Sequence, residues 1–313
     1  MALNILLLLV GLALIIFGAD ALVDGASSIA RRAGISEFVI GLTIVGFGTS
    51  CPELVVSLTG ALQGNADISV GNVVGSNIFN TLLILGLTAV IAPVGISHVN
   101  RVRDIPLCLV VTFIFAFLAI AGGSVNRWEG IAFLVIFAAY ILFCFRTDTG
   151  VAAPAPGGEE KVRKLWLAIL LVLAGLGALA LGGHLFVNKA VDLARALGVS
   201  DKFIAITLLA GGTSLPELAT CIVAAAKKKD QLALGNILGS NVFNILLILG
   251  TSAVIIPLST LAMTLVDFGV LLASAVLVWL WTYTGKRERV DRWEGVVMLL
   301  CFVGYYVFLF LTH

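Results

Sequence analysis

The sequence predicts an all-helical polytopic membrane protein with ten transmembrane helices, arranged as two inverted five-helix repeats. Of its 313 residues, 60% are hydrophobic and 12% are charged, with a mean hydropathy of +1.12, whereas soluble domains carry about 25% charged residues. The apolar residues form runs of roughly 20, the length that crosses a bilayer as a helix. The two halves of the chain also repeat each other in sequence.

Ten apolar segments account for most of the chain, and in lipid such segments form helices because a helix satisfies its own backbone. The first could pass for a signal peptide, but it lacks a basic start and its counterpart in the second half is internal, so we take it as a span. The second and seventh are expected to be broken helices, because a Gly-Thr-Ser-x-Pro motif interrupts each. The ten spans run roughly over 3–25, 36–62, 68–93, 104–121, 128–145, 165–190, 200–226, 231–256, 261–283 and 292–312.

A single linker divides the chain into a first repeat (1–145), the linker itself (146–164) and a second repeat (165–313). The linker is rich in Pro, Gly and Ala, and it is too short for a folded domain. With the N-terminus outside, 15 of the 19 Lys and Arg residues fall in inside loops, as the positive-inside rule requires. We therefore expect both termini outside and the linker in the cytoplasm.

The repeat is detected by a shift of 164 residues, which aligns the halves without gaps from Gly18 to Pro93. The segment 71–93 matches 235–257 at 16 of 23 positions. Because each half holds five spans, the second half enters the membrane from the opposite side, a construction that many secondary transporters share. The identity is strongest at polar positions inside the membrane, which favours a role in a site over a role in packing alone.

The motif GTSCPE (48–53) and its copy GTSLPE (212–217) place a carboxylate within an apolar segment. The proline breaks the helix because it has no N–H, and the freed carbonyls need protein or an aqueous cavity to satisfy them. The Thr and Ser hydroxyls add oxygens. The Glu begins the next half-helix, where the positive end of the dipole favours its ionised form. Oxygens clustered around a negative charge are typical ligands of a hard cation.

The second element, GNVVGSNIFN (71–80), opens the third span, and its copy (235–244) opens the eighth. On a helix its glycines share a face and would let a neighbouring helix approach closely. Its polar residues recur every four positions and form a stripe that we expect to meet the broken helix of the same repeat. Two facing repeats would bring together Thr49, Ser50, Glu53, Ser76 and Asn80 with Thr213, Ser214, Glu217, Ser240 and Asn244.

The two carboxylates give the expected site a charge of −2, which one Ca²⁺ or two Na⁺ would neutralise. A neutralised site costs little to bury, whereas an empty charged one costs much more. A protein that changes conformation readily only when its site is filled acts as an antiporter rather than as a leak.

These paired elements resemble the α-repeats of the calcium/cation antiporter superfamily, in particular the prokaryotic sodium/calcium exchangers, over nearly the whole chain. The resemblance implies Na⁺/Ca²⁺ antiport across a prokaryotic inner membrane, with the first and sixth helices sliding across the rest. Glu53 and Glu217 would be the principal Ca²⁺ ligands, helped by the carbonyls of Thr49 and Thr213. The implied Na⁺ sites use Thr49, Ser76 and the carbonyl of Gly46 on one side, and Thr213, Ser240 and the carbonyl of Ala210 on the other, with Asn80 and Asn244 central.

The chain departs from the family pattern at Asn244, where some members carry an acid. The number of negative charges, and hence the coupling, therefore stays open. Potassium-dependent members place an acid in this element, so Asn argues against K⁺ co-transport. The linker has no room for the regulatory Ca²⁺-binding domains that eukaryotic exchangers insert there.

Three alternatives stay in competition with Na⁺/Ca²⁺ antiport. A carboxylate pair can also carry protons, so an H⁺/Ca²⁺ or other cation exchanger remains open, as does a passive channel. An intramembrane hydrolase is remote, because no HExxH motif, Ser/His pairing or nucleotide-binding loop is present. We expect the ions as cargo and the lipid bilayer as the surrounding, with no cofactor and no nucleic acid partner, and the oligomeric state is open.

Several polar residues in the spans are expected to serve packing or interfacial roles rather than to bind ions. Asp267 has no counterpart motif and is expected to be a packing or interface residue. Others lie at the ends of the first and sixth spans and are expected to be interfacial rather than ligands, namely Asp20, Asp24, His184, Asn188 and Asp192.

Overall fold

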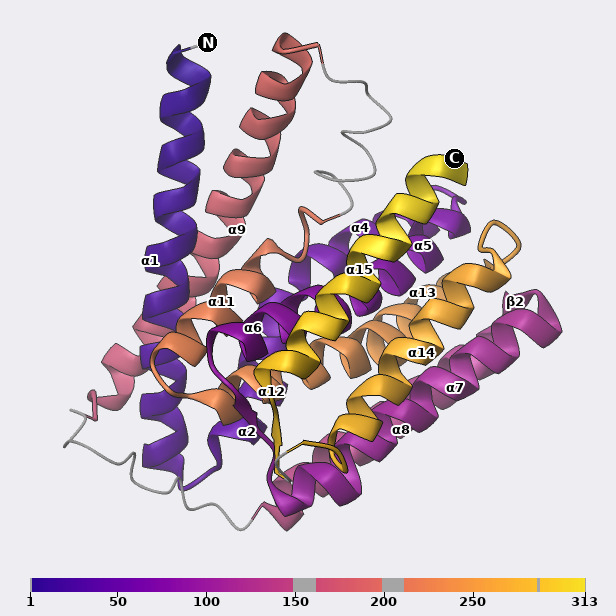
Figure 1. The fold of residues 1–313 in the computed structure, drawn as a ribbon. Helices are drawn as coiled ribbons and strands as arrows, with labels where there is room; N and C mark the ends of the chain where they lie inside the picture. The colour runs from indigo at the N-terminus through magenta and orange to yellow at the C-terminus, as the bar shows by residue number, and fades with distance from the viewer. Residues whose placement is uncertain (1, 149–161, 199–210, 286–287, 313) are drawn as a thin grey trace.

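The protein is built almost wholly of helices, as a computed structural model describes it for residues 2–148, 162–198, 211–285 and 288–312 (Figure 1). Seven of the described helices are long and apolar enough to cross a membrane, and a bent pair adds an eighth. Two shorter apolar helices cover 215–226 and 265–281. Much of the expected seventh span, 200–210, lies outside the described residues, so helix length and composition do not by themselves give the expected count of ten.

The first half of the chain carries these elements: α1 (Ala2–Ala33), α2 (Glu37–Ile40), η1 (Gly41–Val45), α3 (Gly46–Thr49), α4 (Cys51–Leu62), α5 (Ala66–Ile78), η2 (Phe79–Leu85), α6 (Gly86–Ile91), β1 (Val94–Gly95), η3 (Asn100–Asp104), α7 (Ile105–Gly122), β2 (Ser124–Val125) and α8 (Arg127–Thr147), where η denotes a π-helical segment.

The second half carries α9 (Leu165–Ala196), α11 (Leu215–Ala226), α12 (Asp230–Val242), η5 (Phe243–Leu249), α13 (Gly250–Ile255), β3 (Leu258–Ser259), α14 (Leu265–Trp281), β4 (Arg289–Val290) and α15 (Arg292–Thr312). The π-helical segments η2 and η5 lie at equivalent positions of the two halves, directly after the GSN sequences. Such widened turns are frequent at functional sites.

The second span is broken as expected. The helix from Glu37 to Thr49 and the helix α4 are bent by 48° at Ser50. Proline occupies the first turn of α4, where the lack of an N–H is harmless because the first N–H groups of a helix have no partner. The same arrangement begins α11, with Ser214 before the helix and Pro216 in its first turn. Each break therefore aims the start of a half-helix at the interior.

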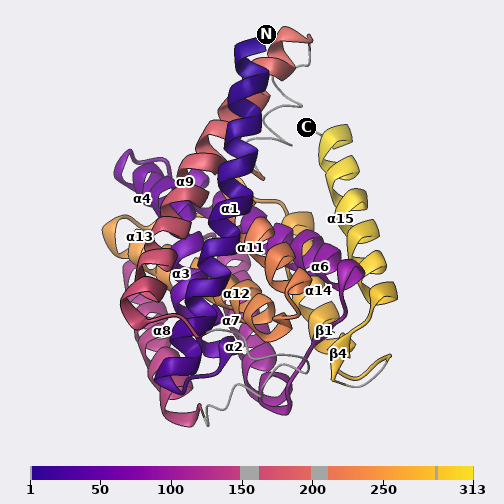
Figure 2. The ribbon, with the colours of Figure 1, turned by 90° about the vertical axis from the view of Figure 1, so that its left-hand side faces the viewer.

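Helices α1 and α9 form a tall pair that leans away from the other helices (Figures 1 and 2). Small residues let their backbones touch: a Cβ on Gly175 would lie 2.7 Å from the Gly18 carbonyl oxygen, and one on Gly182 would lie 2.8 Å from that of Gly11. α1 begins and α15 ends at the same end of the molecule, whereas α8 ends and α9 begins at the other (Figure 1).

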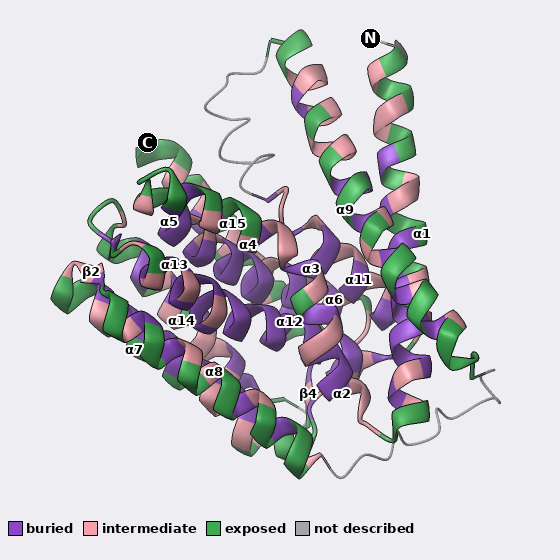
Figure 3. Cartoon of the chain, turned by 180° about the vertical axis from the view of Figure 1, so that it is seen from behind, coloured by how far each residue is buried: buried purple, intermediate pink, exposed green. Residues whose placement is uncertain are grey.

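The helices that carry the polar repeats occupy the centre. The apolar window of Asp230–Ile255 is 94% buried, and that of Ala66–Ile91 is 72% buried, against 11% for α15 (Figure 3). Lipid offers no hydrogen bonds, so polar side chains inside the membrane must face protein or a water-filled space. The outer helices α7, α8 and α15 turn apolar side chains to the lipid and shield the central ones.

Two short antiparallel ladders join the halves at the two ends of α14. In one, Val94 pairs with Val290, and in the other Val125 pairs with Leu258. These pairs correspond to each other under a shift of 164 or 165 residues.

The structure corrects the expectation that Asp267 has no counterpart. Its carboxylate accepts a hydrogen bond from Tyr305 Oη at 2.6 Å, and Asp104 accepts one from Tyr140 Oη at 3.0 Å. The two Asp–Tyr pairs occupy matching places in the two halves. Sequence alignment missed them because the residues around the acids differ.

Candidate functional site

Two carboxylates meet where the broken helices resume. Glu53 and Glu217 lie in the first turns of α4 and α11 and are each 1% exposed. The halves exchange hydroxyl groups: Ser50 Oγ donates to Glu217 Oε1 at 2.9 Å, and Ser214 Oγ donates to Glu53 Oε1 at 3.0 Å. Each serine therefore stabilises the carboxylate of the opposite repeat, not that of its own motif.

Seven side-chain oxygens of the two repeated motifs, including one from each carboxylate, are buried and have no hydrogen-bond partner among the described residues. Buried polar atoms are nearly always paired, so a group of unpaired oxygens indicates that something else fills their needs. Oxygen ligands with two acids suit a hard cation, and the described part of the chain holds no group of three or more His, Cys, Asp or Glu arranged to bind a metal ion. The seven are Glu53 Oε2, Glu217 Oε2, Ser76 Oγ, Ser240 Oγ, Asn80 Oδ1, Asn244 Oδ1 and Thr213 Oγ1.

The first asparagine of each polar stripe holds a broken helix in place. Asn72 Nδ2 donates to the Glu53 carbonyl at 3.2 Å and to Ser57 Oγ at 3.0 Å, so the stripe meets the broken helix of its own repeat as expected. The equivalent Asn236 donates through Nδ2 to Cys221 Sγ of α11, and its Oδ1 accepts from Thr49 Oγ1 at 3.1 Å. The Thr49 hydroxyl is thus satisfied by protein, in contrast to that of Thr213.

Two further asparagines, Asn77 and Asn241, lie at the centre of the site and were not singled out from the sequence. Asn244 Nδ2 donates to Asn77 Oδ1 at 2.9 Å, and Asn80 Nδ2 donates to Asn241 Oδ1 at 3.2 Å. The signal was present, since both follow the stripe serine in the repeated GSN sequence.

Of the two carbonyls that the family resemblance implies as Na⁺ ligands, only that of Gly46 belongs to a described residue. The carbonyl of Gly46 is buried at the start of α3 and accepts the Ser50 N–H at 3.1 Å. Thr49 Oγ1 also lies within hydrogen-bond distance of the same carbonyl oxygen, at 3.5 Å. Ala210 lies outside the described residues.

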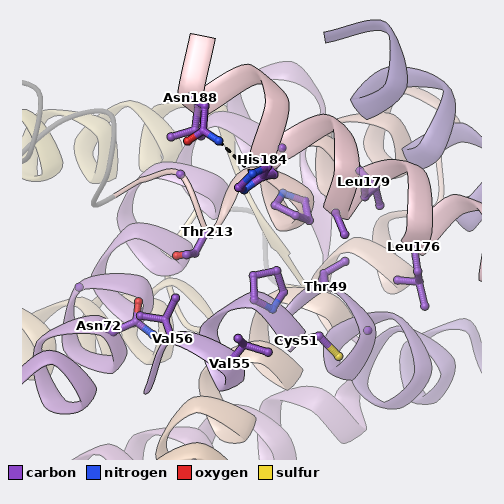
Figure 4. Close-up of a pocket in the computed structure, with 18 of the residues that line it drawn as sticks. Thr49, Cys51, Val55, Val56, Asn72, Leu176, Leu179, His184, Asn188 and Thr213 are labelled. Carbon is purple, nitrogen blue, oxygen red and sulfur yellow. Dashed lines mark hydrogen bonds between the residues drawn. The ribbon is translucent and has the colours of Figure 1, made fainter. Parts of the chain in front are cut away.

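A cavity of about 870 Å³ leads to one side of the site (Figure 4). It lies between α9 and the helices α4 and α5, and Thr49 and Thr213 line its inner part. His184 and Asn188 line it on α9, where their side-chain nitrogens are 2.9 Å apart (Figure 4). These two expected interfacial residues therefore face an access route to the site.

On another side of the molecule α1 packs on α11. Lys227 Nζ lies 2.7 Å from Asp20 Oδ1 and 2.6 Å from Asp24 Oδ1. Burial lowers the pKa of the Lys227 ammonium, but its contacts with the two carboxylates outweigh burial and raise the pKa above its usual value. Asp20 and Asp24 occupy the positions in the first repeat that His184 and Asn188 occupy in the second. Equivalent helix positions thus hold an ion pair in one half, beside a cavity of about 420 Å³, and line the cavity of about 870 Å³ in the other.

The glycines of the two polar stripes differ in how closely other described atoms approach them. A Cβ on Gly235 would lie 2.2 Å from the Phe38 carbonyl oxygen, and one on Gly239 would lie 2.5 Å from that of Leu42, so these glycines allow the expected close approach. Gly71 and Gly75 instead line the cavity. Apart from the adjacent residues and backbone of their own helix, no described atom comes within 3.8 Å of a Cβ built on either. The segment equivalent to 38–42 in the second half, 202–206, lies outside the described residues, so the expectation of close packing stays a prediction for Gly71 and Gly75.

Comparison with known proteins places this geometry in a family. The family model described as sodium/calcium exchanger protein matches residues 3–146 and again 167–311. CaxA of Alkalimonas amylolytica is 40% identical over 310 residues, covering 96% of this chain and 97% of that one. The sodium/calcium exchanger MaX1 of Methanosarcina acetivorans is 33% identical, with 98% of each chain covered.

A solved structure of the sodium-calcium exchanger NCX_Mj, soaked with Na⁺ and Ca²⁺, is also similar, with a TM-score of 0.85 and 31% identity over 97% of this chain and 98% of that one. The chain belongs to the sodium/calcium exchanger family, within the calcium/cation antiporters. It is accordingly an integral membrane protein that acts as a Ca²⁺/cation antiporter and not as an enzyme. The ions are its transported substrates.

Proposed function

We propose that this protein exchanges Na⁺ for Ca²⁺ by alternating access, through ten spans in two inverted five-helix repeats (1–145 and 165–313). The observation that carries the proposal is the reciprocal pair of carboxylates. Glu53 and Glu217 are buried, each is bonded to a serine of the other repeat, and each keeps one oxygen unpaired. Two buried negative charges with spare oxygens require a positive load of about two charges to be stable.

In this proposal Ca²⁺ binds between Glu53 and Glu217, and Na⁺ ions bind on either side of them. The unpaired hydroxyls of Ser76, Ser240 and Thr213 lie around the carboxylates and supply Na⁺ ligands. Ca²⁺ takes 6–8 oxygens at one point, so a set spread over both repeats suits several monovalent ions better than one divalent ion. The carbonyls of Gly46 and Ala210 complete the proposed set, with Thr49 and the central Asn80 and Asn244.

Alternating access is supported by the contrast between the two ends of the α1–α9 pair. At one end Lys227 ties α11 to α1, and at the other a cavity separates α9 from α4. In inverted repeats, exchanging the conformations of the two halves closes the open end and opens the closed one. We infer that sliding of α1 and α9 across the rest brings about this exchange.

The proposed topology has both termini outside and the linker 146–164 in the cytoplasm. The distribution of Lys and Arg supports this orientation. The double match of the family model and the two equivalent ladders between the halves support the inverted repeat. On this assignment the cavity opens to the outside, because it lines the end of α9 that lies away from the linker.

An H⁺/Ca²⁺ exchanger is the second candidate, because each unpaired carboxylate oxygen can take a proton as readily as a cation. The test is Ca²⁺ uptake into proteoliposomes that hold the purified protein. Uptake should require internal Na⁺, should not respond to K⁺, and should be indifferent to a pH gradient without Na⁺. Uptake that ignores Na⁺ and follows the pH gradient would instead establish proton coupling. Ca²⁺ movement only down its own gradient would indicate a channel.

A further inference from the structure

The central asparagines take part in a hydrogen-bond chain whose direction is fixed at one end by a backbone carbonyl. Asn77 Nδ2 donates to the Asn241 carbonyl oxygen at 3.2 Å. A carbonyl can only accept, so the amide nitrogen of Asn77 must face it and Oδ1 must face away. Asn77 Oδ1 faces Asn244, at 2.9 Å from Asn244 Nδ2. Asn244 therefore turns its nitrogen to Asn77, and its own oxygen must point elsewhere.

That remaining oxygen is one of the seven unpaired buried oxygens of the two motifs. Asn244 Oδ1 is buried and has no partner among the described residues, and the same is true of Asn80 Oδ1. Asn80 is held in the same manner, because its Nδ2 donates to Asn241 Oδ1 at 3.2 Å. An amide that rotated by half a turn would present N–H groups to the cation, which would repel it. The orientation of these two amides thus decides whether they attract or repel the ion.

We propose that Asn77 and Asn241 are positioning residues, which hold the amides of Asn244 and Asn80 with their oxygens toward the transported cation. The proposal rests on the proposed function, since it assumes that a cation binds at these oxygens. Each positioning residue acts from the opposite repeat, as the serines do on the carboxylates. The centre of the site is therefore built by both repeats jointly.

The two positioning asparagines differ in the group that accepts from their own amide nitrogen, which is a carbonyl for Asn77 and a hydroxyl for Asn241. Asn241 Nδ2 donates to Thr81 Oγ1 at 2.9 Å, and the residue equivalent to Thr81 in the second repeat is Ile245. A hydroxyl can donate or accept, so it does not fix the direction of Asn241 as the carbonyl fixes that of Asn77. The orientation of the Asn244 amide is consequently fixed more firmly by Asn77 than that of the Asn80 amide is by Asn241.

A double-mutant cycle between Asn77→Leu and Asn244→Ala tests the proposal. The readouts are the Na⁺-dependent Ca²⁺ uptake of proteoliposomes and the rise in unfolding temperature of purified protein on adding Ca²⁺ or Na⁺. We expect Asn77→Leu to raise the KM for Ca²⁺ about five- to tenfold, the effect of one hydrogen bond, with little loss of maximal rate. In the double variant the KM should match that of Asn244→Ala alone, because Asn77 has no amide left to orient.

Asn77→Asp is the conservative variant. It keeps an oxygen facing Asn244 and, as a neutral acid, a donor toward the Asn241 carbonyl, so its KM should lie nearer the wild-type value than that of Asn77→Leu. A second cycle, Asn241→Leu with Asn80→Ala, tests the other half and decides the matter if Asn77→Leu does not fold. Additive losses of affinity in the cycles would overturn the positioning role while wild-type transport upheld the proposed function. Wild-type protein that neither cation stabilises would overturn both proposals.

Discussion

Replacing one of the two carboxylates by its neutral isostere should abolish Ca²⁺ transport at ordinary Ca²⁺ concentrations. In Glu53→Gln, one side-chain oxygen becomes an amide nitrogen. If the amide keeps its oxygen toward Ser214 Oγ, at 3.0 Å in the wild type, its N–H groups replace the unpaired Oε2 that we assign to the cation. If it rotates, the cation gains a neutral oxygen and the Ser214 hydroxyl must find another acceptor. Neither orientation restores the lost charge.

The magnitude follows from burial. Both carboxylates are 1% exposed, so water cannot compensate for the missing charge. Removing one partner of a buried ion pair costs about 3–5 kcal/mol, and 1.36 kcal/mol is a factor of ten. The affinity for Ca²⁺ should fall between about 150- and 5,000-fold. Because Glu217 is bonded to Ser50 as Glu53 is to Ser214, Glu217→Gln should fall in the same range.

The assay is uptake of radioactive Ca²⁺ into Na⁺-loaded proteoliposomes over a wide range of Ca²⁺ concentrations. Glu129→Gln is the matched control, since Glu129 is a half-buried residue that caps the start of α8 and contributes to none of the motif hydrogen bonds described above. It should transport like the wild type. A Glu53→Gln or Glu217→Gln protein that is folded and has a KM within about threefold of wild type would remove that residue from the cation site and refute the charge argument.

Four further results are expected. A membrane-impermeant maleimide added from the outside should label Cys51, which lines the cavity, and should slow transport, whereas Cys51→Ala protein should be insensitive. A reporter within 154–158 should face the cytoplasm and one after His313 the outside, and both on one side would contradict the topology. Vesicles with equal ion gradients but opposite membrane potentials should differ in Ca²⁺ uptake if three Na⁺ replace one Ca²⁺, at about 2.3 kcal/mol per charge per 100 mV, whereas equal uptake would indicate electroneutral exchange. Gly239→Ala should destabilise the fold by about 1–3 kcal/mol, measured as a lower unfolding temperature, because a Cβ there would lie 2.5 Å from the Leu42 carbonyl oxygen. The control Gly304→Ala, with no described atom within 4 Å of its Cβ, should have little effect.

The sequence predicted the helical membrane class and the break at Ser50 because both follow from local chemistry. Long apolar runs form helices in lipid, and a proline within such a run ends a helix. It also predicted that the two motifs face each other, and in the structure the serine of each motif donates to the carboxylate of the other. The identity of the acids and the repeat were therefore enough to place the two carboxylates in one site.

The partners of individual side chains could not be predicted in the same way. Ser50 precedes Glu53 in the chain by three residues, yet it donates to Glu217. The shift that aligns the motifs gives equivalence but not which copy each side chain contacts. The roles of Asn77 and Asn241 were missed for the same reason, since their importance lies in bonds that cross from one repeat to the other. The contrast between Lys227, which lies against Asp20 and Asp24, and its equivalent Gln63 likewise becomes apparent only in the fold.

The proposed alternating access requires that a repeated sequence give its two halves different conformations. If the two halves had identical conformations, both ends of the site would be open or both closed, and no exchange of access could occur. The halves keep equivalent proposed ligands, which are joined to the opposite repeat by reciprocal hydrogen bonds. They differ at the outer positions, where Asp20 and Asp24 hold Lys227 while His184 and Asn188 line a cavity. The equivalent of Lys227 in the first repeat is Gln63, so closure of the cavity end would replace ion pairs with neutral contacts. The two closed states would then differ in stability, and the difference would lie in these few residues rather than in the cation site.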